Sequence, residues 1–236
     1  MLAGVNIALM GISAAEEKRA YHHGDLRNAL ITAAAVLAQE GGPTSVSIRA
    51  AAREVGVTPT AAYRHFANHD ELLAATKERA TEELGAHMAT ELAKRAPVDD
   101  PVRAALGRLA ALGRGYLSFA QAQPGLFRTA FSPGGTVLDA TAERPEDNPY
   151  ELLLDGLNDL VEVGYLDPAD RPLAEVATWA MVHGLATLLD GPLSAMPEEV
   201  REAAIVRGML ALGHGLAANG LDPAQARLMT EELRAG

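Results

Sequence analysis

Apolar residues recur every three or four positions along most of this chain, which is the spacing of one face of an α-helix. This pattern predicts helices at about 25–40, 47–55, 59–66, 69–95, 101–122, 124–131, 149–163, 168–190 and 197–218, with a further one at 223–234. No segment alternates apolar and polar residues between turns, as a half-buried strand does. The sequence therefore predicts an all-α protein in which residues 132–148 form the one long loop.

Several of the predicted helix starts share a local signal, a capping residue followed by proline. The signal occurs at Thr58-Pro59, Asp100-Pro101, Asn148-Pro149, Asp167-Pro168 and Asp222-Pro223. The side chain of the first residue can accept a hydrogen bond from a backbone N–H of the first turn, where the N–H that proline lacks is not needed. Each pair therefore predicts a helix N-terminus.

Two short helices around a glycine are predicted within residues 44–73. Ser47 can cap the first, and Gly56 follows it, where a left-handed residue ends a helix without steric cost. Thr58 caps the second helix after a turn of about three residues. This is the layout of a helix-turn-helix, whose second helix enters the DNA major groove. We therefore interpret residues 59–66 as a recognition helix.

The stretch GVTPTAAYRHFANHDELL at 56–73 resembles the signature of the tetracycline-repressor (TetR) family of bacterial transcription regulators. The matching positions are Gly56, Val57, Thr58, Tyr63, His65, Phe66 and Leu72. Two positions differ, because Thr60 stands where a glycine is common and His69 where a lysine is common. Histidine is neutral at pH 7 unless its pKa is raised, so the phosphate contact expected of a lysine is weakened there.

The resemblance extends over most of residues 21–218. YHHGDLRNAL at 21–30 is similar to the opening of a TetR subgroup, and TWAMVHGLATLLDGPL at 178–193 is similar to that subgroup's C-terminal domain, called WHG after Trp179, His183 and Gly184. The resemblance implies a three-helix DNA-binding domain at 21–68 and a helical ligand-binding and dimerisation domain at 69–236. It also implies a small-molecule effector and a homodimer formed through the eighth and ninth helices.

The predicted recognition helix begins with short side chains, which let it approach base edges, and continues with donors that reach phosphate oxygens. The resemblance places Arg49 on the groove side of the preceding helix, where it reads guanine or, alternatively, contacts phosphate or solvent. The candidate base contacts are Arg49, Pro59, Thr60 and Ala61, and the candidate phosphate contacts are Ser47, Tyr63, His65 and His69. Thr58 and Arg64 complete the set of candidate DNA-binding residues.

A cavity between helices, lined by apolar groups and a few polar ones, is the usual small-molecule site. Its candidate walls are aromatic residues on the fifth and sixth predicted helices and two residues on one face of the eighth. These are Tyr116, Phe119, Phe127, Phe131, Trp179 and His183. The alternative is that the aromatic residues form the core, while His183 and Gly184 support a buried hydrogen bond or close helix packing.

The ninth predicted helix has an apolar face that must be buried, either within one subunit or between two. Its residues are Val206, Met209, Leu210, Leu212, Gly213 and Leu216. The resemblance and the paired half-sites of operator DNA favour the dimer.

Charge is divided unevenly along the chain, whose net charge is −11. Residues 18–69 carry six basic and three acidic side chains, a net +3, so the remainder carries −14. This places the DNA-binding face near the N-terminus. The acidic remainder either discourages nonspecific DNA binding or is an ordinary solvated surface.

The N-terminal segment LAGVNIALMGI is apolar but has about half of the ~20 residues that a membrane-spanning helix needs. We expect residues 1–20 to be a disordered extension, with a dimer or membrane contact as the alternative. His22 and His23 lie near basic residues in a segment that could reach phosphate or the minor groove. No further ligand lies at convincing spacing, so we expect no metal site.

Composition agrees with a protein of this kind. The 236 residues are 48% hydrophobic, enough for a sizeable core, and the chain has no cysteine, which excludes disulfides, thiolate metal sites and a cysteine nucleophile. The helix at 69–95 should extend for about 40 Å and join the DNA-binding and ligand-binding regions.

We therefore expect a cytoplasmic regulator, a repressor in most of the family, that binds a palindromic operator as a dimer and is released by a small molecule. It should need no cofactor. One alternative is an all-helical enzyme with His183 as acid or base, but the chain has no nucleophile elbow, phosphate loop or His-Glu metal pair. The other is a ligand-binding or scaffold protein that has lost DNA binding, which Thr60 and His69 favour.

Overall fold

The computed structural model describes residues 14–134, 145 and 147–218, and their side chains from Leu26 onward. Every regular element in this part of the chain is a helix, as the hydrophobic pattern predicts. The elements are α1 (Ala14–Gly41), η1 (Pro43–Ser45), α2 (Ile48–Val55), α3 (Pro59–Ala62), α4 (His69–Ala93), α5 (Pro101–Ala122), α6 (Pro124–Ala130), α7 (Pro149–Glu162), α8 (Ala174–Asp190) and α9 (Glu198–Leu216).

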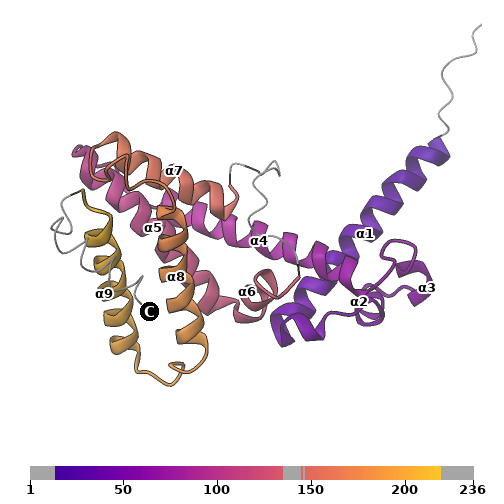
Figure 1. Ribbon diagram of the computed structural model, residues 1–236. Helices are drawn as coiled ribbons and strands as arrows, with labels where there is room; N and C mark the ends of the chain where they lie inside the picture. The colour runs from indigo at the N-terminus through magenta and orange to yellow at the C-terminus, as the bar shows by residue number, and fades with distance from the viewer. Residues whose placement is uncertain (1–13, 135–144, 146, 219–236) are drawn as a thin grey trace, which may run out of the picture.

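The helices form two lobes that are joined by α4 (Figure 1). One lobe consists of α1, α2 and α3, and the other contains α5, α7, α8 and α9. The long helix α4 packs against α1 at one end and against α5 and α7 further along, while α6 lies between the lobes and contacts both α1 and α4.

The small lobe is built around side chains that share a single core. Leu30 of α1, Val46, Ala62 of α3 and Phe66 are each 2% exposed or less. The guanidinium of Arg27 lies 5.0 Å from the centre of the Phe66 ring, on its face. This core fixes the orientation of α3 relative to α1.

The caps predicted for the helix-turn-helix are confirmed. Ser47 Oγ accepts a hydrogen bond from Ala50 N at 3.1 Å, and Thr58 Oγ1 accepts one from Ala61 N at 3.3 Å. Gly56 ends α2 in the left-handed region, with φ of +77°. Asp100 caps α5 in the same way, and Asn148 caps α7 by accepting from Tyr150 N, two residues on.

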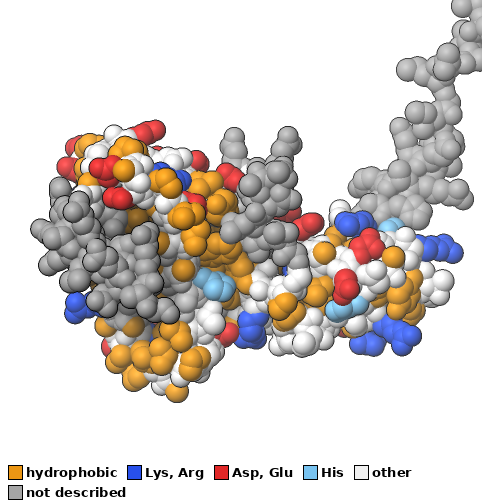
Figure 2. Space-filling model, in the orientation of Figure 1, with side chains coloured by type: hydrophobic (Ala, Val, Ile, Leu, Met, Phe, Trp, Pro, Cys, Tyr) orange, Lys and Arg blue, Asp and Glu red, His pale blue; other side chains and the backbone are white. Residues whose placement is uncertain are grey.

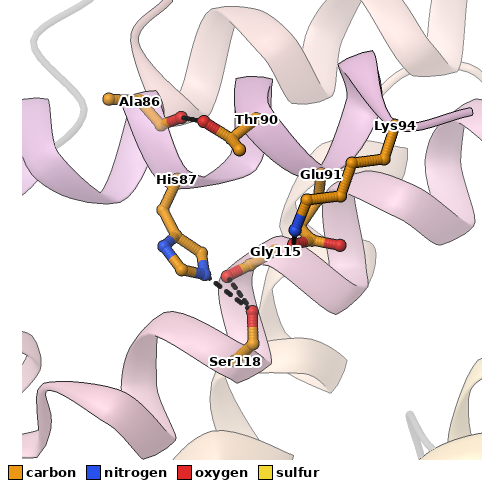
Figure 3. Close-up of polar contacts among 7 residues, drawn as sticks. All are labelled: Ala86, His87, Thr90, Glu91, Lys94, Gly115 and Ser118. Carbon is orange, nitrogen blue, oxygen red and sulfur yellow. Dashed lines mark hydrogen bonds and ion pairs between the residues drawn. The ribbon is translucent and has the colours of Figure 1, made fainter.

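In the large lobe, α4 and α5 approach each other closely at a glycine. A Cβ on Gly115 would lie 2.7 Å from Met88 Cα, so no larger residue fits there without movement of the helices. Beside this point His87 Nε2 lies 2.9 Å from Ser118 Oγ, which donates in turn to the carbonyl of Gly115 (Figure 3). The two helices are thus held together by packing and by a polar contact.

Three helix boundaries differ from the sequence-based expectation. The expected start of a helix at Pro168 is wrong: Asp167 Oδ1 accepts from Ala169 N at 2.8 Å, which closes a turn instead of capping a helix, and α8 begins only at Ala174. The first helix begins at Ala14, not near residue 25, so it includes residues 14–20 of the expected disordered extension. α3 ends at Ala62, and residues 63–65 continue as turns. Their backbone N–H groups bond to carbonyls that lie either three or four residues earlier in the chain.

Some expectations concern parts of the chain that the structure does not describe. Residues 1–13, most of the expected loop at 132–148 and the expected helix at 223–234 lie outside the described residues. The side chains of His22 and His23 lie outside them as well.

Candidate DNA interface and ligand cavity

The candidate DNA-binding residues lie at the end of the small lobe, from the N-cap of α2 through α3 and the turns that follow it to the start of α4. Most of them are exposed, and Ser47, Ala61 and His65 are half-buried. Tyr63 is 46% exposed although it is aromatic. Lys and Arg side chains gather around this lobe (Figure 2), where Arg49, Arg53 and Arg64 are all exposed. An exposed basic surface around a capped recognition helix is suited to contact with phosphate and base edges.

A cavity of about 570 Å³ lies in the large lobe, between α4, α5, α7, α8 and α9. Its volume is within the range of small-molecule sites. The residues that line it include Lys77, Glu78, Glu82, Met88, Tyr116, Phe131, Thr178, Trp179 and Met209. Three of the six predicted ligand-binding residues therefore line the cavity, namely Tyr116, Phe131 and Trp179.

The other three predicted ligand-binding residues lie behind the wall. Phe119 is fully buried, and its ring meets the ring of His87 edge-on at 5.9 Å. Phe127 is buried against Phe131, with ring centres 5.1 Å apart. His183 hydrogen-bonds Tyr116. For Phe119 and Phe127, the alternative that these aromatic residues form the core describes the structure better.

A short chain of hydrogen bonds joins Trp179, Tyr116 and His183. Trp179 Nε1 donates to Tyr116 Oη at 3.2 Å, and Tyr116 Oη lies 2.8 Å from His183 Nδ1. Because an indole N–H can only donate, the hydroxyl accepts from it and donates its own proton to Nδ1. Burial lowers the pKa of His183, which favours the neutral ring that can accept this proton.

Burial also acts on the middle member of this chain. It raises the pKa of the Tyr116 hydroxyl well above its ordinary value, against a smaller opposite effect of the hydrogen bond from Trp179. The hydroxyl therefore stays protonated near neutral pH and can both accept from Trp179 and donate to His183.

Lys77 connects α4 to the chain just after α6. Its ammonium donates to the carbonyls of Ser132 at 2.6 Å and Pro133 at 2.9 Å, and to that of Gly134. Partial burial lowers the pKa of Lys77. An ammonium group has three protons, so these three carbonyls use all of its donors.

A second contact joins the cavity wall to the small lobe through α6. A Cβ on Gly125 would lie 2.3 Å from the carbonyl oxygens of both Ala38 and Gln39, so the start of α6 rests directly on the backbone of α1. Phe131, just after the end of α6, lines the cavity. The sequence predicts a connection between the lobes through the helix at 69–95 alone, and α6 provides a second one.

Several residues of the cavity wall have no signal in the sequence that would mark them as ligand-binding. Lys77 and Met88 carry no motif of their own, Thr178 lies in the WHG-like stretch but was not singled out, and Met209 was expected on an apolar face buried either within one subunit or between two. The apolar face of α9 is in fact divided: Leu212 and Leu216 are buried in the large lobe, whereas Val206 and Leu210 are more than half exposed. Helical periodicity predicts an apolar face but not the partner that covers it.

None of the helices in the described part of the chain combines the length and apolarity that crossing a bilayer requires.

The fold and the two sites define a class of protein: an all-helical chain with a helix-turn-helix in one lobe and a ligand-sized cavity in the other. Comparison with protein families gives the same answer. Residues 30–76 match the profile described as bacterial regulatory proteins, tetR family, and residues 109–212 match that of the tetracyclin repressor-like C-terminal domain. The chain belongs to the tetR family and is a DNA-binding transcription regulator. The family is not enzymatic, which decides against the enzyme alternative.

Solved structures with the same architecture include a protein of unknown function from Rhodococcus sp. RHA1. It is 26% identical, with a TM-score of 0.66, over 84% of this chain and 98% of that one. A TetR family transcription regulator from Marinobacter aquaeolei VT8 is 18% identical, with a TM-score of 0.57, over 81% of this chain and 97% of that one. A protein from Shewanella sp. PV-4, described as a putative tetR family transcription regulator, is 19% identical, with a TM-score of 0.54, over 79% and 97% of the two chains. No curated protein sequence matches the chain.

Proposed function

We propose that this regulator is a cytoplasmic repressor that binds a palindromic operator as a homodimer and leaves it when a small molecule occupies the cavity. The observation that carries this proposal is the course of α4. The helix begins at His69, directly after the helix-turn-helix, and further along Lys77 and Met88 line the cavity. One continuous helix therefore contacts both sites and provides a shared element whose position each site can bias.

In this proposal the recognition helix reads the operator through its first turn. Pro59, Thr60 and Ala61 approach base edges, and Arg49 reads a guanine through two parallel hydrogen bonds. Ser47, Tyr63, His65 and His69 contact phosphates, and Thr58 and Arg64 support the same surface. The exposure of Arg49 and Tyr63 supports these roles, because both side chains are available to a partner.

The proposed homodimer forms through α8 and α9. Large apolar side chains are exposed on both helices, including Leu188 at 46%, Val206 at 54% and Leu210 at 55%. Val206 and Leu210 are four residues apart, so they lie on one face of α9. Exposed apolar residues gathered on two adjacent helices support an interface between two copies of the chain.

We further propose that the chain belongs to the subgroup with a WHG-type C-terminal domain. Trp179 and His183 are both tied to Tyr116, which gives these two residues of the motif a shared structural role. A Cβ on Gly184 would meet no atom within 4 Å among the described residues, so this glycine does not serve helix packing within one subunit. In a dimer through α8, the open space beside it can accommodate the partner.

In this proposal, binding of the effector tilts α4 and so changes the distance between the two recognition helices of the dimer, which releases the DNA. Half-sites of an operator are separated by one turn of DNA or a multiple, so a changed distance weakens binding to both together. Crystals of the dimer with and without effector test this step. An unchanged separation of the two Tyr63 residues would count against it.

Recovery of genomic fragments by the purified protein tests the proposal as a whole. The fragments are captured over a series of salt concentrations and sequenced, since nonspecific retention declines with salt while specific binding persists. We expect a shared near-palindrome upstream of a few genes. No enrichment at any salt would favour a scaffold protein that has lost DNA binding, and the variant His69→Lys would then test whether the missing lysine is the cause.

A further inference from the structure

Arg27 of α1 lies against a residue that closely follows the recognition helix, although the two are far apart in the chain. Its guanidinium carbon is 5.0 Å from the centre of the Phe66 ring, over the ring's face. Phe66 is fully buried, so the core of the small lobe holds its ring, whereas Arg27 is exposed. A guanidinium over an aromatic face is attracted to it by a cation–π contact. The charged end of Arg27 therefore has a defined position at the surface.

The contact with Phe66 leaves the hydrogen-bond donors of Arg27 without an acceptor. A guanidinium carries five N–H groups, and an aromatic ring offers them no oxygen or nitrogen atom. Arg27 has no hydrogen bond or ion pair with any other described residue. Arg79, Arg128 and Arg171 differ, because each of them pairs with a carboxylate. Arg27 therefore presents its donors and its positive charge to a partner.

The position of Arg27 connects it to the proposed DNA interface. Phe66 directly follows His65 and lies three residues after Tyr63, and both of these are proposed phosphate contacts. In the small lobe α1 packs against α2 and α3, so it lies beside the helix-turn-helix (Figure 1). A DNA backbone that reaches the exposed side chain of Tyr63 therefore comes near the guanidinium of Arg27.

The acidic residues in this part of the chain do not neutralise Arg27. Asp70 and Glu71 lie in the first turn of α4, and neither forms an ion pair with it. The carboxylate of Glu71 accepts a hydrogen bond from Ala67 N at 2.7 Å, which engages it at the helix start. Lys and Arg side chains gather around the lobe (Figure 2). This surface therefore attracts an anion such as a DNA phosphate.

We propose that Arg27 binds a phosphate of the operator backbone through two parallel hydrogen bonds, and that Phe66 holds its guanidinium in position for this contact. The inference rests on the proposed function and adds a contact from α1, outside the helix-turn-helix, to the same interface. The planar fork of a guanidinium matches two oxygens of a phosphate. Because Phe66 already places the guanidinium, less side-chain freedom is lost when DNA binds. Arg27 then supplies a permanent positive charge to an interface in which His69 replaces the common lysine.

The salt dependence of DNA binding tests this proposal, because its slope reports how many phosphates the protein neutralises. The full-length protein is titrated into two duplexes, one with the most enriched sequence among the genomic fragments and one with that sequence scrambled. Arg27→Met removes the charge and keeps an apolar contact with Phe66. The slope of log affinity against log salt should fall by about 2, since each phosphate contributes about 0.9 and a dimer makes the contact twice. Affinity should fall by about tenfold or more on both duplexes, because a phosphate contact carries no sequence information.

Three further variants separate the contact from other effects. Arg27→Lys keeps the charge but not the fork, so it should retain the natural slope and lose about threefold in affinity. Arg103→Met removes an exposed arginine of α5, in the large lobe, and should change neither quantity. If Arg27→Met does not fold, which thermal unfolding would reveal, Arg27→Gln removes the same charge with a polar side chain and should lower the slope equally.

Replacement of single operator phosphates by neutral methylphosphonates locates the contact. At one phosphate of each half-site the natural chain should lose about tenfold in affinity, whereas Arg27→Met or Arg27→Gln should lose little there, since its contact is already absent.

The proposal is overturned if the variants without the charge keep the natural slope and affinity, or if no phosphate position distinguishes them from the natural chain. No binding of either duplex by the natural chain would contradict both this inference and the proposed function. Equal affinity for the two duplexes, with the expected loss of slope, would contradict the proposed function alone. Selective binding with an unchanged slope in Arg27→Met would contradict this inference alone.

Discussion

Arg49 and Tyr63 are both exposed beside the recognition helix, but we expect them to contribute differently to operator binding. Arg49→Ala should remove discrimination at one base pair, by about 1–3 kcal/mol, because guanine is read through two hydrogen bonds. Tyr63→Phe should weaken binding to all sequences alike, by about 1 kcal/mol, because a phosphate contact carries no sequence information. Binding to the operator and to its single-base variants measures both effects. A uniform loss from both substitutions would remove the distinction.

His183 should make stability depend on pH. Burial lowers its pKa, so as pH falls through its ordinary value near 6.5 the unfolded chain binds a proton that the folded chain does not. The contribution to the free energy of unfolding is thus fully present above that pH and declines below it. Urea unfolding at pH 7.5 and 5.5 should show a smaller decline for His183→Gln than for the natural chain. The matched control is His69→Gln, at an exposed histidine, and an equal decline in all three proteins would contradict this account.

Some roles of single residues can be predicted from the sequence and others cannot. Ser47 and Thr58 were predicted as caps because a cap depends on backbone atoms only three residues away. The role of Tyr116 depends on Trp179 and His183, which come more than 60 residues later in the chain. Spacing can place each of these residues on a helix, but only the packing of α5 against α8 brings them into contact.

At the scale of elements, the helices were predictable from periodicity, and the errors concern how they start and end. Asp167-Pro168 has the same local pattern as Asp100-Pro101, yet only the second pair begins a helix. The difference lies a few residues further along the chain. Pro172 disfavours a helical backbone at Arg171, and Leu173 has a φ of +67°, so α8 begins only after these residues. An Asp-Pro pair predicts a turn or a cap but not what the following residues allow.

The contact of α6 with α1 can be tested by a substitution that adds one methyl group. Gly125→Ala places Cβ against two backbone carbonyls that cannot move independently, and should lower the free energy of unfolding by about 1–3 kcal/mol. Gly107→Ala of α5 is a matched control, since its Cβ would lie 2.3 Å from the flexible guanidinium of Arg95. That variant should be nearly neutral, because Arg95 can turn aside and the helical preference of alanine offsets the hydrogen bond to the carbonyl of Ala104 that Arg95 then gives up. Equal effects in urea unfolding would show that the α1 contact is unimportant.

At the scale of the whole molecule, the proposed dimer depends on exposed apolar residues of α9. Val206→Asp combined with Leu210→Asp should convert the protein to a monomer, because charges would be buried without partners in the interface. Light scattering coupled to size-exclusion chromatography measures the change in mass. Val36→Asp on α1 is the control, because Val36 is 49% exposed but lies far from α8 and α9 in the sequence, and α1 lies far from them in Figure 1. A dimer that persisted in the double variant would place the interface elsewhere.

The contacts at Gly125 and Lys77 have a consequence for experiments with operator DNA. If the cavity and the recognition helix are coupled through α6 and α4, the coupling is reciprocal: the factor by which effector weakens DNA binding equals the factor by which DNA weakens effector binding. Adding operator to the effector-bound protein should therefore expel effector, and a DNA fragment of unrelated sequence at the same concentration should expel much less. The operator would act on the cavity as a competitor that never enters it.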